Sequence, residues 1–323
     1  MVASLPAWAQ PEGPLFRGGY RMTPEDFEVV EQPAFTPRGE GEHLLVEVVK
    51  RGANTGWVAG ELARRAGCKV QDIGYCGDKD RHAVTRQWFS VRDPMQTLDW
   101  PVDEGGEGWR ILQSARHDRK LRRGDHAGNR FRLRVELDAP ATEPVLAAAR
   151  QRLAAGVANY FGPQRFGRGA GNLAMVEAWV GGKRLPGRGP ERGRILSSAR
   201  SFLFNEVLAA RIRCGCLSRF LEGDALIDGL PTGPLWGRGR SPLAGEAAAF
   251  EADVLEPYRA WCERLEHAGL SQERRPLLLF PVGVGVEATE SGLELVFELP
   301  PGSFATSVLV ALGDFEDVAK RGD

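Results

Sequence analysis

Two carboxylates, Asp78 and Asp80, flank Lys79 in a turn that begins with glycine, and Arg81 and His82 follow directly. Nearby opposite charges lower the pKa of a carboxylate and keep it ionised at neutral pH. An ionised aspartate that is held in place can attack a sugar carbon or an activated ring. These residues alone also fit an ordinary solvated turn, because Gly-Asp-Lys-Asp is a common turn composition.

The sequence on both sides of this turn predicts two strands. Residues 73–76 form a short apolar entry, and residues 87–91 alternate in polarity with a period of two. The two carboxylates are therefore expected on a loop between strands.

The composition is typical of a soluble globular protein. The chain has 323 residues, 42% hydrophobic and 26% charged, with a formal net charge of −1. This length allows two domains or one large domain. No run of 18 apolar residues is present, so we expect no membrane span. Residues 1–10 lack the regions of a signal peptide, which favours a cytoplasmic location.

The cysteines and histidines show no metal-binding pattern. The five cysteines are Cys68, Cys76, Cys214, Cys216 and Cys262. Their number is odd and no Cys-x-x-Cys pair occurs, so we expect free thiols in a reducing compartment. The five histidines contain no His-x-x-x-His pair, and we expect no metal site.

A basic stretch covers residues 110–134, with nine Lys or Arg against two Asp, an excess of seven positive charges. Such a stretch is either a solvated loop or a contact with a nucleic-acid backbone, because clustered cations supply the salt-sensitive part of that affinity. The candidate phosphate contacts in its loop are Arg119, Lys120, Arg122 and Arg123.

Alternating polarity predicts several strands in the first half of the chain. Phe27, Val29 and Glu31 share one face of a strand, and residues 43–50 and 109–114 form two more. Residues 128–137 alternate between apolar side chains and arginines, which is typical of an antiparallel sheet with one wet face. Helices are predicted from Asn54 or Thr55 to Ala66, with Gly67 as the stop, and over residues 141–157.

The middle of the chain changes character at residues 156–168, which are aromatic, basic and rich in glycine. This mixture suits an RNA-facing loop, where rings and Arg planes stack on bases. The alternative is a packed turn with Phe161 and Phe166 in a core.

The remaining segments give a pattern of sheet, helical middle and sheet. We expect helices over 197–213 and 246–268, an apolar run at 217–221, a Gly/Pro-rich loop over 229–242, strands over 278–283 and 293–299, and a helix that starts near residues 303–309. The fold class is therefore α+β, with a middle domain inserted into a discontinuous domain.

Several stretches together resemble the TruD family of tRNA pseudouridine synthases, and they follow the family's order along nearly the whole chain. The carrying motifs are Pro24-Glu25-Asp26-Phe27, Gly39-Glu40-Gly41-Glu42-His43, Gly77-Asp78-Lys79-Asp80 continuing through His82-Ala83-Val84-Thr85 to Gln87-Trp88, Gly128-Asn129-Arg130-Phe131, Asn159-Tyr160-Phe161-Gly162 with Gln164-Arg165-Phe166-Gly167, Arg200 to Asn205, and Gly302-Ser303-Phe304-Ala305-Thr306-Ser307.

The resemblance implies a pseudouridine synthase core with a mixed, mainly antiparallel sheet flanked by helices. Residues 1–154 and 279–323 would form this core, and residues 155–278 an inserted α/β domain specific to the family. The implied substrate is a uridine of tRNA at position 13, in the D-stem region. No metal or organic cofactor is implied, and we expect a monomer.

The resemblance also implies roles for single residues. Asp80, not Asp78, matches the family's nucleophile. Phe27 and Phe304 match the walls around the flipped base, and Asn129 matches a residue that hydrogen-bonds to it. Two further substrate contacts are expected at Phe131 and Arg21. One further RNA backbone contact is expected at Arg165. Arg21 stands where a Lys is expected in much of the family, and the two cations differ in geometry.

Two other function classes are considered. A non-catalytic RNA-binding protein or tRNA chaperone on the same fold is the alternative, although the intact Asp80 counts against it. A hydrolase of nucleosides or glycosides would need a second carboxylate that activates water. Asp78 is expected to point away from Asp80, which disfavours the hydrolase.

Overall fold

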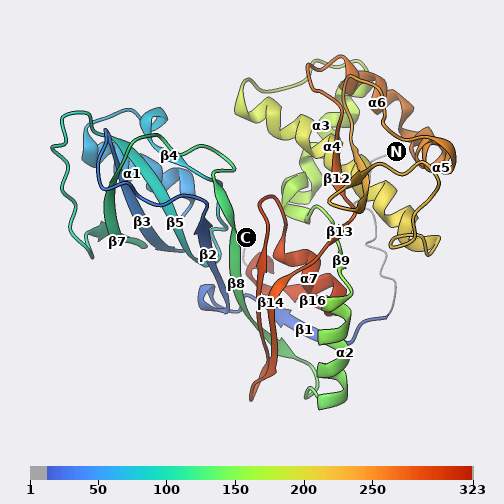
Figure 1. The fold of residues 1–323 in the computed structure, drawn as a ribbon, viewed down its shortest axis with the longest axis horizontal. Helices are drawn as coiled ribbons and strands as arrows, with labels where there is room; N and C mark the ends of the chain where they lie inside the picture. Colours follow the sequence, from blue (N-terminus) through green and yellow to red (C-terminus); the bar gives the residue numbers. More distant parts are fainter. Residues whose placement is uncertain (1–12, 322–323) are drawn as a thin grey trace. The chain divides into compact units, whose positions relative to one another are not determined.

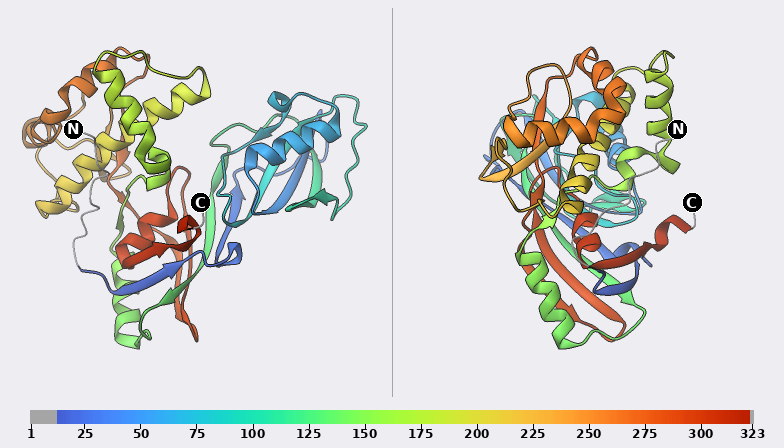
Figure 2. Two further views of the ribbon diagram at one scale, coloured as in Figure 1. Left: turned by 180° about the vertical axis from the view of Figure 1, so that it is seen from behind. Right: turned by 90° about the vertical axis from the view of Figure 1, so that its right-hand side faces the viewer.

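The computed structural model describes residues 13–321, which divide into two compact units (Figures 1 and 2). The sheet unit comprises residues 15–154, 281–302 and 312–321, and the helical unit comprises residues 13–14, 155–280 and 303–311. The chain thus passes between the units after residues 14, 154, 280, 302 and 311. The domain limits expected from the family, with 155–278 as the insertion, stay a prediction.

The sheet unit is built on one mixed sheet, which in the described chain has eleven strands. Eight strands follow each other in the order β14 (Val282–Ala288), β15 (Gly292–Leu299), β8 (His126–Leu137), β2 (Phe27–Pro33), β5 (Val84–Arg92), β3 (His43–Arg51), β7 (Trp109–His117) and β6 (Gly105–Gly106). Three more, β1 (Phe16–Tyr20), β16 (Gly313–Asp317) and β4 (Gly74–Tyr75), pair beside this path. Only the β2–β5 and β1–β16 pairs are parallel, so the prediction of a mainly antiparallel sheet is confirmed.

The longest strand is β8 (Figure 1). Its burial pattern follows the predicted alternation. Phe131, Leu133 and Val135 are buried, whereas the arginines between them are exposed. The exposed face carries carboxylates from neighbouring strands as well: Arg132 lies 2.8 Å from Glu294. The arginine face is therefore partly neutralised within the sheet.

Two helices accompany this sheet. Helix α1 (Thr55–Ala66) begins after Asn54 and ends at Gly67, whose φ of 65° is the left-handed conformation that glycine adopts without strain. Helix α2 (Glu143–Ala154) is shorter at both ends than predicted. Arg150 of this helix donates a hydrogen bond to the Val286 carbonyl of β14 at 2.8 Å.

The helical unit contains α3 (Gly171–Val180), α4 (Pro190–Arg213), α5 (Gly245–Leu255), α6 (Arg259–Glu266) and most of α7 (Ala305–Leu312). Its strands are β10 (Leu226–Ile227), β11 (Leu230–Leu235) and β12 (Glu273–Pro276) in one sheet, with β9 (Val157–Ala158) and β13 (Leu278–Leu279) as a second pair. Short 3₁₀ turns lie at Pro24–Asp26 and Val70–Asp72 in the sheet unit, Pro163–Phe166, Arg168–Ala170 and Glu256–Tyr258 in the helical unit, and Val318–Arg321 near the end.

The structure corrects three predictions in this unit. Helix α4 starts at Pro190, seven residues earlier than expected, and proline suits the first helical turn. The single helix expected over 246–268 is two helices, interrupted at Glu256–Tyr258, which contains a proline. The Gly/Pro-rich loop contains the strand β11, because the φ of proline permits an extended chain and α4 packs against this strand.

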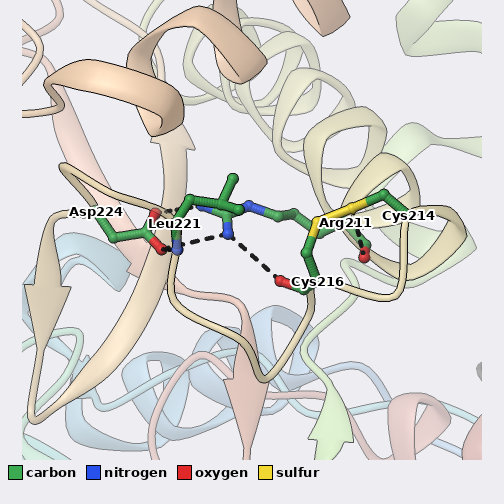
Figure 3. Close-up of a disulfide and its surroundings, with 5 residues drawn as sticks. All are labelled: Arg211, Cys214, Cys216, Leu221 and Asp224. Carbon is green, nitrogen blue, oxygen red and sulfur yellow. Dashed lines mark hydrogen bonds and ion pairs between the residues drawn. A yellow bond between two sulfur atoms is a disulfide. The ribbon is translucent and has the colours of Figure 1, made fainter.

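A disulfide joins Cys214 and Cys216, so the prediction that all five cysteines are free thiols is wrong (Figure 3). The chain leaves α4 through Gly215, with φ 66°, and its reversal brings the two Cα atoms to 5.4 Å, within disulfide range. The buried ion pair between Arg211 and Asp224 holds the returning segment. Helices of membrane-spanning length and apolarity are absent from residues 13–321.

Candidate active site

The turn that carries Asp78 and Asp80 lies between β4 and β5 and is fixed by side chains that bind its backbone. Thr55, at the first position of α1, accepts a hydrogen bond from the Lys79 amide at 2.9 Å. The same hydroxyl donates to Gln87 at 2.9 Å, and the Gln87 amide donates to the Gly77 carbonyl at 3.2 Å. Thr55 and Gln87 are buried, so these bonds are shielded from water.

A buried lysine holds the backbone at Asp80 itself. The Lys50 ammonium donates to the carbonyls of Asp80 and Ala53, both at 2.8 Å. Burial lowers the pKa of Lys50 to about 8, although the charge of Asp80 opposes this shift. Lys50 was not among the candidate residues, because a lysine near the end of a strand is usually solvated.

The Asp80 carboxylate is 37% exposed and is oriented by two donors. One oxygen accepts from the Arg21 guanidinium at 2.5 Å, and the other accepts from the backbone amide of His82 at 3.0 Å. The exposure leaves room for a substrate atom, while the two donors fix the direction of the carboxylate.

Arg21 bridges Asp80 to Asp317, a residue of β16 near the end of the described chain. Its Nε lies 3.0 Å from Asp317, and a second nitrogen contacts the other oxygen of that carboxylate. Burial opposes the charged form of Arg21, but the charges of Asp80, Tyr20 and Asp317 together outweigh burial, and the pKa of Arg21 is raised. Arg21 has φ 62°, a left-handed backbone conformation that is uncommon for residues other than glycine. The same residue contacts both carboxylates, Asp80 and Asp317.

Sequence reasoning missed Asp317, which is 296 positions away from Arg21 and belongs to no motif. Because its carboxylate is engaged by Arg21 on both oxygens, it is not available to activate a water. Asp78 is also engaged elsewhere, 2.7 Å from Arg123. Asp317 therefore does not supply the second carboxylate that a hydrolase needs.

Two of the candidate aromatic residues lie beside this cluster in the sheet unit. Phe27 and Phe131 are buried on neighbouring strands, with ring centroids 6.3 Å apart in an edge-to-face arrangement. The Arg21 guanidinium lies 5.2 Å from the Phe27 ring, within the range of a cation–π contact. Phe131 stacks on Phe297 at 5.4 Å.

Asn129 is buried on β8 and receives a hydrogen bond from Lys79 at 2.7 Å. Lys79 also forms an ion pair with Glu31, again at 2.7 Å. Glu31 lies on the face of β2 that also carries the buried residues Phe27 and Val29. A charged residue on an otherwise apolar strand face is the sequence signal that could have identified Glu31 as a functional residue. Asp80, Phe27, Phe131, Arg21 and Asn129 are thus brought together in one unit.

The basic loop lies between β7 and β8 and its cations are partly paired. Arg119 contacts Asp125 and Arg123 contacts Asp78, each at 2.7 Å. Lys120 donates to the carbonyl of Gln71, and Arg122 is exposed. Exposed ion pairs are weak, so phosphates can compete for these cations.

The candidate residues Arg165 and Phe304 belong to the helical unit. The Arg165 guanidinium lies 5.3 Å from the Phe161 ring and 5.7 Å from the Phe304 ring, and it donates to Ser197 at 3.2 Å. Phe161 is buried and also contacts Phe304. Phe161 and the buried Phe166 are core residues, as the packed-turn alternative expected.

A further cation supports these rings. The Arg275 guanidinium lies 4.2 Å from the Phe161 ring, and burial, together with the charge of Arg165, lowers its pKa to about 10. Within residues 13–321, no group of three or more His, Cys, Asp and Glu is placed to hold a metal ion.

Comparison with known proteins gives a consistent result. The model of the family described as tRNA pseudouridine synthase D (TruD) matches residues 12–180. The chain is 46% identical to tRNA pseudouridine synthase D of Cellvibrio japonicus, with 90% of this chain and 87% of that protein covered. It is 42% identical to the protein of the same name from Nitrosococcus oceani, with 92% and 90% covered.

A solved structure shares the fold. It is described as the putative tRNA pseudouridine synthase D (TruD) of Methanosarcina mazei, and it matches with a TM-score of 0.69 and 21% identity over 96% of each chain.

Proposed function

The chain belongs to the TruD family of tRNA pseudouridine synthases, and from this premise we propose that it isomerises uridine 13 of tRNA with Asp80 as the nucleophile. The chain is thus an isomerase that acts on tRNA. The observation that carries the proposal is the Asp80 carboxylate, directed by Arg21 and by the His82 amide while its backbone carbonyl is held by Lys50.

The reaction needs a positioned carboxylate more than any other group. Isomerisation breaks the bond between C1′ and N1 of uridine, turns the uracil, and forms a bond between C1′ and C5. All atoms are retained and nothing is oxidised, so the balance requires no redox partner. An ionised Asp80 either attacks the sugar or assists the departure of uracil through a glycal-type route.

The base must leave its stack to reach Asp80, which costs a few kcal/mol. We assign Phe27, Phe131 and Phe304 to contacts with the flipped base, and Asn129 to a hydrogen bond with it. Arg21 acts by directing Asp80.

Clustered cations favour the RNA backbone. We assign Arg119, Lys120, Arg122, Arg123 and Arg165 to contacts with it. We further propose that the enzyme acts as a monomer in the cytoplasm, without a metal or organic cofactor.

Pseudouridine mapping on tRNA transcripts tests the proposal, with wild-type protein and with Asp80→Asn and no cofactor added. We expect pseudouridine at position 13 with the wild type only, while Asp80→Asn binds tRNA nearly as well, because the substitution keeps the size of the side chain. A normal yield from Asp80→Asn would show that another group is the nucleophile. Binding without modification by either protein would indicate an RNA-binding role, and released uracil a hydrolase.

A further inference from the structure

The side-chain amide of Asn129 has its orientation fixed by the cation that it contacts. The Lys79 ammonium lies 2.7 Å from the Asn129 oxygen. An ammonium carries donors only, so the amide atom that faces it must be the oxygen and not the nitrogen. Among the described residues none accepts a hydrogen bond from the Asn129 nitrogen. That nitrogen is therefore available to a ligand, whereas one of the two lone pairs of the oxygen already accepts from Lys79.

Lys79 is itself held in place by a buried carboxylate. The Glu31 side chain is fully buried and the Lys79 side chain is 6% exposed, with 2.7 Å between their charged atoms. The other Glu31 oxygen accepts from the backbone amide of Trp88 at 3.1 Å. A buried ion pair loses the hydration of both charges, but it fixes the positions of the two side chains, because neither charge has water as an alternative partner.

The titratable neighbours of this pair do not compete for Lys79. Burial lowers the pKa of His126, and the charge of Lys79 lowers it further although the charge of Glu31 opposes this, which favours the neutral form of His126. Burial also raises the pKa of the Cys76 thiol to about 12, and the charge of Glu31 adds to this. The only charged partner of Lys79 on this side is Glu31, within the part of the chain described.

We propose that Glu31 and Lys79 act as positioning residues that make Asn129 a hydrogen-bond donor toward the substrate base. Asn129 then meets a carbonyl oxygen of uracil, O2 or O4, and does not accept from N3–H. The inference rests on the proposal that Asn129 contacts the base, and it adds the direction of that hydrogen bond and the residues that set it.

Substitution of Asn129 by aspartate separates the two directions. The carboxylate of Asn129→Asp accepts from Lys79 as the amide does, but it has no N–H to donate. We expect kcat/KM for tRNA to fall at least as far as in Asn129→Ala, roughly 5- to 150-fold. If Asn129 accepted from N3–H, Asn129→Asp would keep near wild-type kcat/KM, and that result would overturn the inference.

A double-mutant cycle tests whether Lys79 acts through Asn129. Lys79→Met should lower kcat/KM, and Lys79→Met combined with Asn129→Ala should lose no more than Asn129→Ala alone. Lys79→Arg, which keeps the cation, should recover part of the loss. Additive losses would overturn the role of Lys79, because they would mean that it acts on the turn independently of Asn129.

This test is distinguishable from a failure of the proposed function. If Asn129→Ala is fully active while Asp80→Asn is inactive, the nucleophile stands and only the base contact of Asn129 is wrong. Thermal midpoints of all variants, measured alongside, identify any variant that is simply misfolded.

A second, independent feature is the cationic segment 183–194, which connects α3 to the first turns of α4 (Figure 1). It contains five exposed cations against one carboxylate, Glu191; the cations are Lys183, Arg184, Arg188, Arg192 and Arg194. None of the five forms an ion pair with another described residue. In the basic loop, by contrast, Arg119 and Arg123 are paired with carboxylates.

The cationic segment 183–194 also borders a hollow on the surface. An open hollow of ≈ 580 Å³ is lined by Arg184, Leu185, Pro186, Gly187, Arg188 and Glu191. Leu185 is buried and anchors the segment between its charged neighbours. We infer that this segment is a second phosphate-binding surface for tRNA, an inference that rests on tRNA as the substrate. Unpaired cations gain more from a polyanion than cations that already have a carboxylate.

Salt-dependent binding tests the surface. Arg184, Arg188, Arg192 and Arg194 are changed together to Gln in the Asp80→Asn background, and binding of tRNA is titrated from low to high salt. Arg119, Lys120, Arg122 and Arg123 changed to Gln form the matched variant. The segment variant should bind more weakly, with the slope of log K against log salt reduced by about 0.7–0.9 for each phosphate that the protein no longer neutralises.

An affinity and a slope equal to those of the parent would overturn the second surface. A reduced slope in the matched variant alone would locate the backbone contacts in the basic loop. Pseudouridine formation by the wild-type protein is measured on the same tRNA in parallel. This measurement shows that the tRNA is a substrate, so that an unchanged binding affinity is not explained by the choice of a wrong RNA.

Discussion

At the scale of single residues, the carboxylate of Asp80 depends on two cations that differ in kind. Arg21 contacts the carboxylate and bridges it to Asp317, whereas Lys50 contacts only the backbone carbonyl. Substitution of the first cation should therefore affect the chemistry, and substitution of the second should affect the fold around the turn and its response to pH.

Arg21→Lys and Arg21→Met separate charge from geometry. Lysine lacks the planar fork that spans Asp80 and Asp317, but it keeps the positive charge beside Asp80. Because we assign the effect on catalysis to that charge, we expect Arg21→Lys to keep most of the single-turnover rate. Arg21→Met removes charge-assisted hydrogen bonds, and the rate should fall roughly 10- to 150-fold. Equal rates for Arg21→Met and wild type would show that the bridge has no part in catalysis.

Lys50 should give a pH signature in stability. Burial lowers its pKa from 10.5 to about 8, so between these pH values the unfolded chain holds a proton that the folded protein does not. The free energy of unfolding therefore rises with pH in this window through Lys50. Relative to Lys50→Met, the wild type should gain stability from pH 8 to about 10.5 in denaturant titrations. Parallel pH curves for the two proteins would contradict this.

At the scale of elements, the turn is attached to the first residue of α1. The hydroxyl of Thr55 joins the Lys79 amide to the side chain of Gln87, and the side chains of Thr55 and Gln87 are buried. Helix α1 itself is fixed by apolar side chains such as Val58 and Leu62, which pack into the core formed with β3 and β5. The position of Asp80, the proposed nucleophile, thus depends on how one helix packs on the sheet.

Thr55→Val keeps the shape of the side chain and removes its hydrogen bonds. The Lys79 amide and Gln87 then lack a partner, which costs about 1–3 kcal/mol of stability for each unpaired group. We expect a lower denaturation midpoint and a lower turnover rate. Thr55→Ser is the matched control and should retain both. Wild-type rate and midpoint in Thr55→Val would show that the hydroxyl is dispensable.

At the scale of the whole molecule, the proposed machinery is divided between the two units. Asp80, Phe27, Phe131 and Asn129 belong to the sheet unit, and Phe304 belongs to the helical unit with Arg165. Phe304 lies in the segment 303–311, which is nine residues long. The chain enters the helical unit before this segment and returns to the sheet unit after it.

Phe304→Ala tests the contribution of the helical unit to the chemical step. Loss of an aromatic ring that stacks on a base costs about 1–3 kcal/mol, so the single-turnover rate should fall roughly 5- to 150-fold. Phe220, an exposed phenylalanine of the same unit, is the control, and Phe220→Ala should leave the rate unchanged. An undiminished rate in Phe304→Ala would remove Phe304 from the base contacts.

The sequence by itself determined the features that depend on neighbours along the chain. The alternation of β8, the limits of α1 with Gly67 as its stop, and the turn between β4 and β5 follow from periodicity and capping, which are local. The motifs, read against a known family, pointed to Asp80 as the proposed nucleophile and to the residues proposed around it.

Only the tertiary structure decided which distant groups meet. Sheet order brings β1 beside β16, and Arg21 thereby reaches Asp317 from the far end of the chain. The pairing of β2 with β8 sets Glu31 opposite Asn129, and Lys79 joins the two. The partners of buried charges depend on packing between segments of high sequence separation, and no local pattern encodes that packing. For the same reason the burial of Lys50, the strand β11 and the Cys214–Cys216 disulfide were not predicted.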